Sequence, residues 1–413
     1  MLRRYCVLYG ALLWILYVLT YVRFVRNVGR SFDAEPPGSS LEITPVTPAL
    51  TRRPALSRLV TAPAELITSP PPSDPMMTSI PLRLVVFTTM KPCEGKLVHA
   101  QYNSVMSWRR LPLRPPPIVV IFGGQDDVAR IANRTGALHV PRGDCIDPHS
   151  GTALLGKMIQ HVTLNYPNAD MYGFLNADII LPRFSADAFR LVSTLFTQFF
   201  LVGHRFSVGV EGDLPFHDSQ WDVMYVQKAF RSGTAAKDRP DAEDYFFWSR
   251  GFLKGEAVPD FHIGRPAYDN WFVHHAIHTD QPVIDGTDLL LPLHQNHDYS
   301  HLKTNNSVRY WGSVEQQRNY DLALQHGGWQ HGLVEFTPFR ISPKRCGLRG
   351  LLEEAAKKSP LLVSSPPCQV YFRREWKPLQ EEWSLADVHD MYGKYVRPGQ
   401  TGTYRAALQE PPQ

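Results

Sequence analysis

Residues 172–181 read Tyr-Gly-Phe-Leu-Asn-Ala-Asp-Ile-Ile-Leu, an apolar stretch interrupted by Asn176 and Asp178. The pattern predicts a buried strand that ends on two oxygen-bearing side chains, and in open α/β sheets ligands bind at the carboxyl edge. Amide and carboxylate oxygens suit a divalent cation such as Mg²⁺ or Mn²⁺, which in turn can hold a diphosphate. The alternative is an Asx-turn, in which both side chains bond only to their own backbone.

Strands and helices alternate on either side of this stretch. Apolar, β-branched runs predict strands, and apolar residues at helical spacing predict helices. The expected strands are 82–89, 118–122, 137–140 and 200–203, and the expected helices are 101–111, 126–133, 152–164 and 186–199. Near-continuous apolar strands alternating with helices are typical of a mostly parallel sheet covered by helices. We therefore expect an α/β, Rossmann-type fold with Asn176 and Asp178 at the end of its fourth strand.

The amino-terminal segment has the composition of a membrane anchor. Residues 5–22 carry no charge and are flanked by arginines, and their number is near the lower limit for crossing a bilayer as a helix. A cleaved signal peptide is the alternative, although its apolar core is normally shorter. We expect a cytoplasmic tail and signal anchor over 1–30, a Pro/Ser/Thr-rich stem over 31–80, one large catalytic domain over 81–345 and a carboxyl-terminal extension over 346–413.

Charge and cysteine content narrow the classes of function. The net charge of +4 is modest, and no basic run with interleaved aromatic residues indicates nucleic-acid binding. Four of the five cysteines lie outside the apolar segment and allow two disulfides in three pairings, of which Cys346 with Cys368 is the first choice. Sequons at Asn133 and Asn305 predict N-glycosylation, in keeping with a lumenal location.

Three clusters rich in aromatic and polar residues follow in the second half of the chain. They span 244–251, 263–271 and 294–301, and each combines Trp, Tyr or His with Asp or Arg. Aromatic faces with convergent polar groups suit sugar rings, which present both C–H faces and hydroxyls. The clusters therefore indicate a carbohydrate-binding site rather than a plain core.

The order of the motifs resembles that of nucleotide-sugar-dependent glycosyltransferases of the GT-A architecture, over about residues 81–305. The motifs that carry the resemblance are Ser107-Trp108, the Asn-x-Asp stretch, Val202-Gly203-His204-Arg205, Asp244-Tyr245-Phe246, the run from Gly264 to Trp271 and the run from His294 to Tyr299. The anchor, stem and catalytic domain look like those of Golgi type II enzymes. The resemblance implies a single-pass protein of the Golgi or ER membrane with a lumenal catalytic domain. It also implies sugar transfer from a nucleotide-diphosphate sugar, with UDP-sugar favoured, to a glycan, glycoprotein or glycolipid acceptor.

The metal motif of that architecture is usually Asp-x-Asp, and here Asn176 replaces the first aspartate. Asp178, together with Asn176, is expected to hold the sugar diphosphate and a divalent cation, Mn²⁺ first and Mg²⁺ second. The resemblance further implies that a late histidine completes the metal shell, with His294 and His297 as the candidates. Because the Asn removes one negative charge, the dependence on metal is put in question.

Five further residues are assigned to the donor. Thr88 and Thr89 end the first expected strand and would border the nucleotide. Asp126 follows the second strand and is placed near the base or ribose. Arg205 and Arg265 are expected to face phosphate or sugar.

A carboxylate is needed as general base if the transfer inverts configuration. Asp269 is the first candidate, because Pro266 fits the first turn of a helix and an acid in that turn is electrostatically favoured. The same favourable placement supplies a purely structural alternative for Asp269. Asp244 is the second candidate.

Several interpretations stay open beside this one. His294, His297 and His301 are spaced three and four residues apart, a pattern that zinc sites also use. His274 and His275 are expected to be packing or surface residues. A catalytically inactive sugar-binding module would keep the aromatic clusters without the metal. A nucleotidyltransferase would use a similar sheet and cation, although no glycine-rich phosphate loop with a following Arg or Lys occurs early in the domain.

Overall fold

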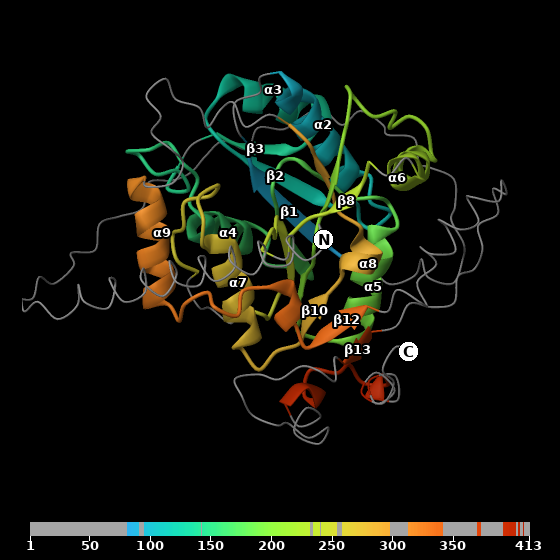
Figure 1. The fold of residues 1–413 in the computed structure, drawn as a ribbon, viewed down its shortest axis with the longest axis vertical. Helices are drawn as coiled ribbons and strands as arrows, with labels where there is room; N and C mark the ends of the chain where they lie inside the picture. The colour runs from blue at the N-terminus through green and yellow to red at the C-terminus, as the bar shows by residue number, and fades with distance from the viewer. Residues whose placement is uncertain are drawn as a thin grey trace, which may run out of the picture. The chain divides into compact units, whose positions relative to one another are not determined.

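A mixed sheet forms the centre of the computed structural model (Figure 1). Among the described residues nine strands join in the order β13-β12-β10-β6-β9-β4-β1-β2-β3. They are β1 (Leu84–Thr89), β2 (Ile118–Phe122), β3 (Leu138–Val140), β4 (Met171–Leu175), β6 (Phe200–Val202), β9 (Tyr245–Ser249), β10 (Val283–Asp285), β12 (Phe339–Ile341) and β13 (Val370–Phe372). Most neighbours are parallel, whereas β9 runs against β4 and β6, and β13 runs against β12. The expected mostly parallel α/β fold is confirmed.

The structure describes residues 81–90, 95–141, 143–231, 234–239, 241–253, 258–297, 313–341, 370–372, 391–401, 404 and 408. All of them belong to one compact unit, Ser69–Gln413. The expected stem at 31–80 and the residues Cys93, Cys346, Cys368 and Asn305 lie outside the described residues, as do Asp298 and His301. Within the described part Cys145 is buried and forms no disulfide.

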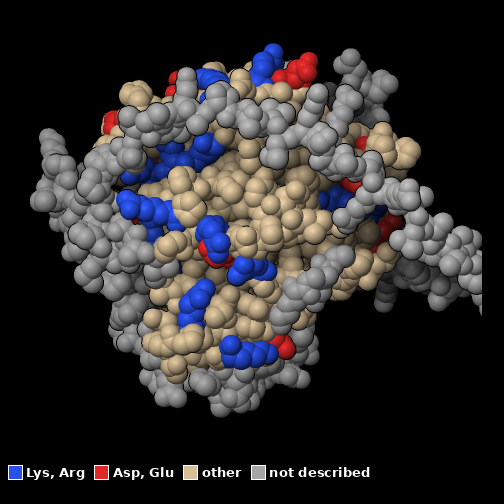
Figure 2. All heavy atoms as spheres, turned by 180° about the vertical axis from the view of Figure 1, so that it is seen from behind, with Lys and Arg blue, Asp and Glu red and all other residues tan. Residues whose placement is uncertain are grey.

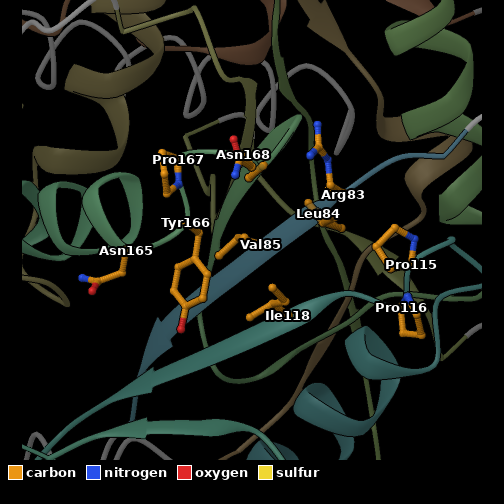
Figure 3. A pocket seen from close by; sticks show the side chains of 11 residues that line it. Arg83, Leu84, Val85, Pro115, Pro116, Ile118, Asn165, Tyr166, Pro167 and Asn168 are labelled. Carbon is orange, nitrogen blue, oxygen red and sulfur yellow. The ribbon is translucent and has the colours of Figure 1, made fainter. Parts of the chain in front are cut away.

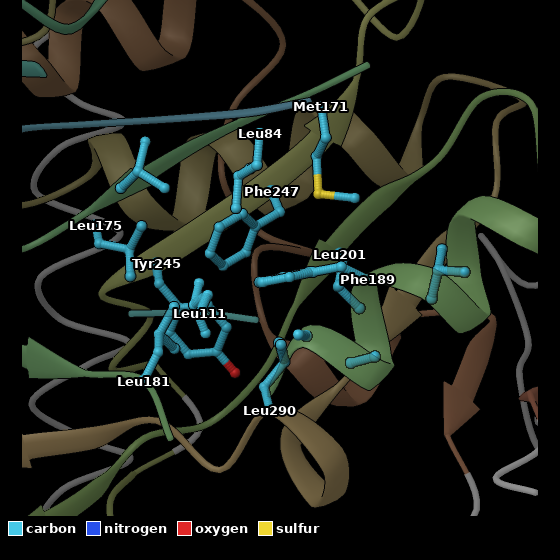
Figure 4. Packing of buried hydrophobic residues seen from close by; sticks show 14 of the residues in the cluster. Leu84, Leu111, Met171, Leu175, Leu181, Phe189, Leu201, Tyr245, Phe247 and Leu290 are labelled. Atoms are coloured by element: carbon cyan, nitrogen blue, oxygen red, sulfur yellow. The ribbon is translucent and has the colours of Figure 1, made fainter. Parts of the chain in front are cut away.

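Helices cover both faces of the sheet because its strands are apolar on both sides. Successive strand residues point to opposite faces, so Leu84 and Val86 of β1 pack in one buried cluster, and Val85 and Phe87 pack in another. The first cluster includes residues of α2 (Lys96–Arg109), α3 (Asp126–Thr135) and α5 (Ser185–Leu195), and Figure 4 shows part of it around Phe247. The second includes residues of α4 (Leu155–Asn165), α7 (Tyr268–Ile277) and α9 (Val314–Gln325), which Figure 1 shows on one side of β1.

A second, smaller sheet continues directly from the end of β4. It has the order β5-β11-β7-β8 and comprises β5 (Ile179–Ile180), β7 (Phe206–Val208), β8 (Ala236–Lys237) and β11 (Leu293–Gln295). Its apolar side packs with Trp221 of α6 (Trp221–Arg231) in a third buried cluster. This sheet brings residues near 178, 206 and 294 together, although they are distant in sequence.

The carboxyl-terminal residues that the structure describes join the main sheet and its core. β13 pairs with β12 at the sheet edge, and Tyr392 and Tyr404 are buried in the cluster that also contains Phe339. The short helix α8 (Thr287–Leu290) and the 3₁₀ helix η2 (Val334–Phe336) complete the described elements. Figure 2 shows that Lys and Arg side chains on the face opposite that of Figure 1 are separated by neutral residues and mixed with Asp and Glu.

The expected membrane location is corrected. Among the residues that the structure describes, no helix is long and apolar enough to cross a membrane. The longest of them, α2, has 14 residues, or about 21 Å, against a hydrocarbon layer of about 30 Å. The expected single-pass location in the Golgi or ER membrane is therefore not supported. The expected anchor at 5–22 lies outside the described residues.

Candidate metal centre and its polar surroundings

The turn after β4 carries Asn176 and Asp178 at the carboxyl edge of the main sheet. The backbone N–H of Ile179 donates to the carbonyl of Asn176 at 3.1 Å and closes this turn. The chain then enters β5, which pairs antiparallel with β11 so that Ile179 lies opposite His294. The N–H of Gln295 donates to the carbonyl of Asp178 at 3.0 Å. Strand register therefore sets the end of β11 beside Asp178.

Asp178, His294 and His297 form a compact group of metal-ligating atoms. The Oδ2 atom of Asp178 lies 3.1 Å from Nε2 of His297 and 3.8 Å from Nε2 of His294. One ligand atom from each residue falls within 4.8 Å of the others. The site forms at the carboxyl edge of the main sheet, toward which β1 and its parallel neighbour β4 both run.

The electrostatics of this group suit a cation. His294 is 3% exposed, and burial lowers its pKa to about 4 even though the nearby Asp178 favours the charged form. His294 is therefore a neutral imidazole at pH 7, which is the form that binds metals. One carboxylate with two imidazoles fits Mn²⁺ or another transition metal better than Mg²⁺, which prefers oxygen ligands. The residues present thus fit a divalent cation.

Helix α2 holds β11 in place through a buried polar cluster. The amide Nε2 of Gln295 donates to the carbonyl of Ala100 at 2.8 Å and to Oγ of Ser104 at 3.0 Å, and its Oε1 accepts from Asn103 at 3.0 Å. Gln295 is 1% exposed, so each of these bonds replaces a lost contact with water. Gln295 fixes the strand segment that presents His294 and was not predicted from the sequence.

Asn176 belongs to a second network, centred on Asp244. Antiparallel pairing of β4 with β9 brings the two residues together, and the Asn176 amide donates to Oδ1 of Asp244 at 2.6 Å. The hydroxyl of Tyr268 donates to Oδ1 of Asn176 at 3.3 Å. Arg205 is ion-paired with Asp244, and its Nε donates to Oδ2 of Asp238 at 2.7 Å. An aspartate at 176 would face the Asp244 carboxylate, which gives a physical reason for the Asn.

Asp269 lies in the first turn of α7, as the sequence predicts, but the helix begins at Tyr268 and not at Pro266. The reason is Ala267, whose φ of 82° places it in the left-handed region outside the helix. Burial raises the pKa of Asp269 to about 6, Asp241 adds to the rise and Arg205 opposes it. Asp269 is thus close enough to Arg205 to interact with it electrostatically.

A further carboxylate, Glu243, lies next to Asp269. Burial, and after it the charge of Asp269, raises the pKa of Glu243 well above its ordinary value. The amide of Asn270 donates to Oε2 of Glu243 at 3.0 Å and to the carbonyl of Gly332 at 2.8 Å. Two carboxylates with raised pKa values, Asp269 and Glu243, therefore interact electrostatically, a feature typical of functional sites.

The remaining predicted donor residues bond to other partners. Thr88 is buried and donates to the carbonyl of Leu175 at 2.6 Å, and Thr89 donates to the carbonyl of Phe122 at 3.1 Å. Asp126 is exposed at the start of α3.

Two further residues that the sequence analysis singled out are Arg265 and Asn133. Arg265 is ion-paired with Glu315, which also accepts a hydrogen bond from Thr152 at 2.7 Å. The predicted glycosylation residue Asn133 is exposed on α3, and the hydroxyl of Thr135 in its sequon is buried against the carbonyl of Ile131 at 2.7 Å.

A separate hollow of about 250 Å³ lies at the opposite edge of the sheet (Figure 3). It is lined by the amino ends of β1 and β2 and by the segment from Asn165 to Ala169. β1 and β4 are parallel, so this hollow is at the far end of the strands from Asn176. None of the predicted site residues lines it.

No family model and no curated protein matches the chain. Among solved structures, a mycobacterial protein aligns at 15% identity and a TM-score of 0.30, over 55% of this chain and 71% of its own. The glycosyltransferase GlyE of Streptococcus pneumoniae aligns at 11% identity and a TM-score of 0.25, over 68% of this chain and 64% of its own. An inositol-1-phosphate CTP transferase from T. maritima aligns at 12% identity and a TM-score of 0.24, over 44% of this chain and 77% of its own. TM-scores this low carry no inference about this chain.

Proposed function

We propose that the chain is a nucleotide-sugar-dependent glycosyltransferase whose donor binds at the carboxyl edge of the main sheet. The observation that carries the proposal is the group of Asp178, His294 and His297, held by strand register at the position where α/β sheets bind ligands. Arg205 and Asp244 form an ion pair that is linked to this edge through Asn176. The proposed acceptor is a carbohydrate. The aromatic clusters at 244–251 and 263–271 were expected to bind it, but Trp248, Tyr268 and Trp271 are buried in the core.

In this proposal each residue has a defined role. Asp178, His294 and His297 would hold a divalent cation, Mn²⁺ by preference, which would supply positive charge against the diphosphate. Arg205 is held at the same edge by Asp238 and Asp244. Asn176 positions Asp244 by donating a hydrogen bond to its carboxylate.

Asp269 is the general base of the proposed transfer. With a pKa of about 6 it is mostly ionised at pH 7 and still basic enough to accept a proton. The acceptor hydroxyl oxygen bonds to the anomeric carbon while the bond from that carbon to the diphosphate oxygen breaks. The hydroxyl proton passes to Asp269, and the nucleoside diphosphate leaves.

The experiment is product analysis with a panel of UDP- and GDP-sugars and simple glycan acceptors, with Mn²⁺ or with a chelator. Release of nucleoside diphosphate and a glycosylated product supports the proposal, and loss of both in Asp178→Ala links them to the site. Asp321→Asn is the matched control, because Asp321 is exposed on α9. Formation of pyrophosphate from a nucleoside triphosphate would show a nucleotidyltransferase instead. Saturable sugar binding without turnover would show an inactive module.

A further inference from the structure

Three histidines come together at the carboxyl-terminal end of α7, outside the site described above. His274 and His278 are four residues apart on the same face, and His331 comes from the segment after α9. One ring nitrogen from each lies within 4.8 Å of the others. The sequence interpretation treated His274 as a packing or surface residue, because nothing in the local pattern indicates that His331 lies against it.

Hydrogen bonds fix which ring nitrogen His274 and His278 offer. Nε2 of His274 lies 2.9 Å from the carbonyl of Gly327, and Nδ1 of His278 lies 2.7 Å from the carbonyl of His274. A carbonyl only accepts, so both of these nitrogens carry the proton, and the lone pairs are on Nδ1 of His274 and Nε2 of His278. Metal-binding histidines usually donate their second N–H to a carbonyl or carboxylate in this way.

The separation of two of these ring nitrogens suits a tetrahedral ion. Nδ1 of His331 lies 3.4 Å from Nε2 of His278. With Zn–N bonds of about 2.0–2.1 Å, two nitrogens of a tetrahedral site are about 3.3 Å apart. Nδ1 of His274 accepts the backbone N–H of His331 at 3.1 Å, so its lone pair is directed to the same region. Binding of a metal ion to Nδ1 of His274 would replace this one hydrogen bond from the backbone of His331.

The surroundings favour neutral imidazoles and leave access for an ion. Burial, and after it the charge of His278, lowers the pKa of His274 to about 4, and burial also lowers the pKa of His331. Burial therefore favours the neutral form of His274 and His331, which is the form that binds metals. His278 is exposed and His331 is half-buried, so water can fill the fourth position. The carboxyl end of α7 contributes a negative dipole.

We propose that His274, His278 and His331 form a Zn²⁺ site that fastens the end of α7 to the segment following α9. The metal would fix the helix that carries Tyr268 and Asp269 at its other end. The site does not depend on the transfer reaction proposed above, because it is built from different residues.

The experiment uses the full chain carrying Asp178→Ala, which removes the candidate metal centre at the sheet edge. After dialysis against a chelator the protein is titrated with Co²⁺, whose visible absorbance reports tetrahedral coordination, and Zn²⁺ is then added as competitor. We expect one Co²⁺ per chain, displaced by Zn²⁺. His331→Ala should weaken Co²⁺ binding by at least about tenfold, because even the loss of a residue that only hydrogen-bonds to a metal ligand weakens metal binding by about tenfold or more.

His326→Ala is the matched control, because His326 is exposed in the same segment and lies outside the three-histidine group. If His331→Ala does not fold, His278→Gln tests the same site at an exposed position. No tetrahedral Co²⁺ spectrum in the Asp178→Ala chain overturns the proposal. An equal loss of binding in His326→Ala and His331→Ala also overturns it, since the ion would then not be held by the three residues.

Discussion

Replacing Asn176 by aspartate restores the usual Asp-x-Asp pattern and should nevertheless destabilise this protein. The Asn176 amide donates to Oδ1 of Asp244 at 2.6 Å. In Asn176→Asp a carboxylate takes the place of that donor and faces another carboxylate. Two like charges relaxed to about 4 Å repel by about 4 kcal/mol at an effective dielectric constant of 20. The variant also loses a hydrogen bond to a charged group, worth about 1.5–3 kcal/mol.

Part of this loss is offset by Arg205, which is ion-paired with Asp244. We therefore expect the free energy of unfolding to fall by about 2–4 kcal/mol at about pH 8. An entropy of unfolding of about 2.1 cal/mol/K per residue over roughly 300 residues gives about 0.6 kcal/mol/K. The melting temperature should then fall by about 3–6 °C, measured by thermal unfolding without added metal.

The effect should depend on pH with a defined sign. Facing carboxylates hold one proton more readily, so the pKa of the pair is raised in the folded state. Between the unfolded pKa of about 4 and that raised value the folded state binds more protons, and stability falls as pH rises. The loss of stability caused by Asn176→Asp should therefore be smaller at about pH 4 than at about pH 8.

Asn176→Ala is the matched control, because it removes the same hydrogen bond and adds no charge. Its deficit should be nearly the same at both pH values. The reasoning is refuted if Asn176→Asp melts with the wild type at about pH 8, or if its deficit is as independent of pH as that of Asn176→Ala.

Three further changes have defined outcomes. Asp269→Asn should abolish transfer yet raise the free energy of unfolding at pH 7 by up to about 3 kcal/mol. The reason is that the pKa of Asp269 is raised from 3.8 to about 6, so the stability of the wild type falls as pH rises through that window. Equal pH profiles of unfolding for the variant and the wild type would contradict this. Gly173→Ala would set a Cβ 2.4 Å from the ring of Phe247 and should lower stability by about 1–3 kcal/mol in thermal unfolding. Trp108→Phe removes the 2.8 Å hydrogen bond from Nε1 to the Ile179 carbonyl. The variant should lose about 1–3 kcal/mol of stability, and amide hydrogen exchange in the turn after β4 should become faster. Unchanged exchange would show that this hydrogen bond does not hold the turn.

The first half of the fold could be predicted from the sequence because its signals are local. The strands and helices up to β6 occur within a few residues of their expected positions, apart from a break between β4 and β5 and an earlier start of α2. β9 was missed as a strand. It inserts antiparallel between β4 and β6 with both faces buried, so its five residues show no alternation of polar and apolar side chains.

The candidate site could be predicted only where a short motif lies on a predictable element. Asp178 follows a strand that the sequence identifies, and the structure brings His294 and His297 to it through the register of β5 and β11. Asp238 and Gln295 were missed, since their roles depend on pairing between distant segments. Arg265 was assigned to phosphate or sugar and is ion-paired with Glu315, a partner fifty positions away that no local pattern indicates.

The most direct test of the central claim is nucleotide binding by thermal unfolding, with UDP or GDP and with or without Mn²⁺. At 100 times Kd a ligand stabilises by about 2.7 kcal/mol, or about 4 °C here. The account predicts a Mn²⁺-dependent shift that disappears in Asp178→Ala and in His294→Ala but persists in Asp321→Asn. A shift that persists in Asp178→Ala, or no shift with any nucleotide, would contradict a donor site built on Asp178 and the two histidines.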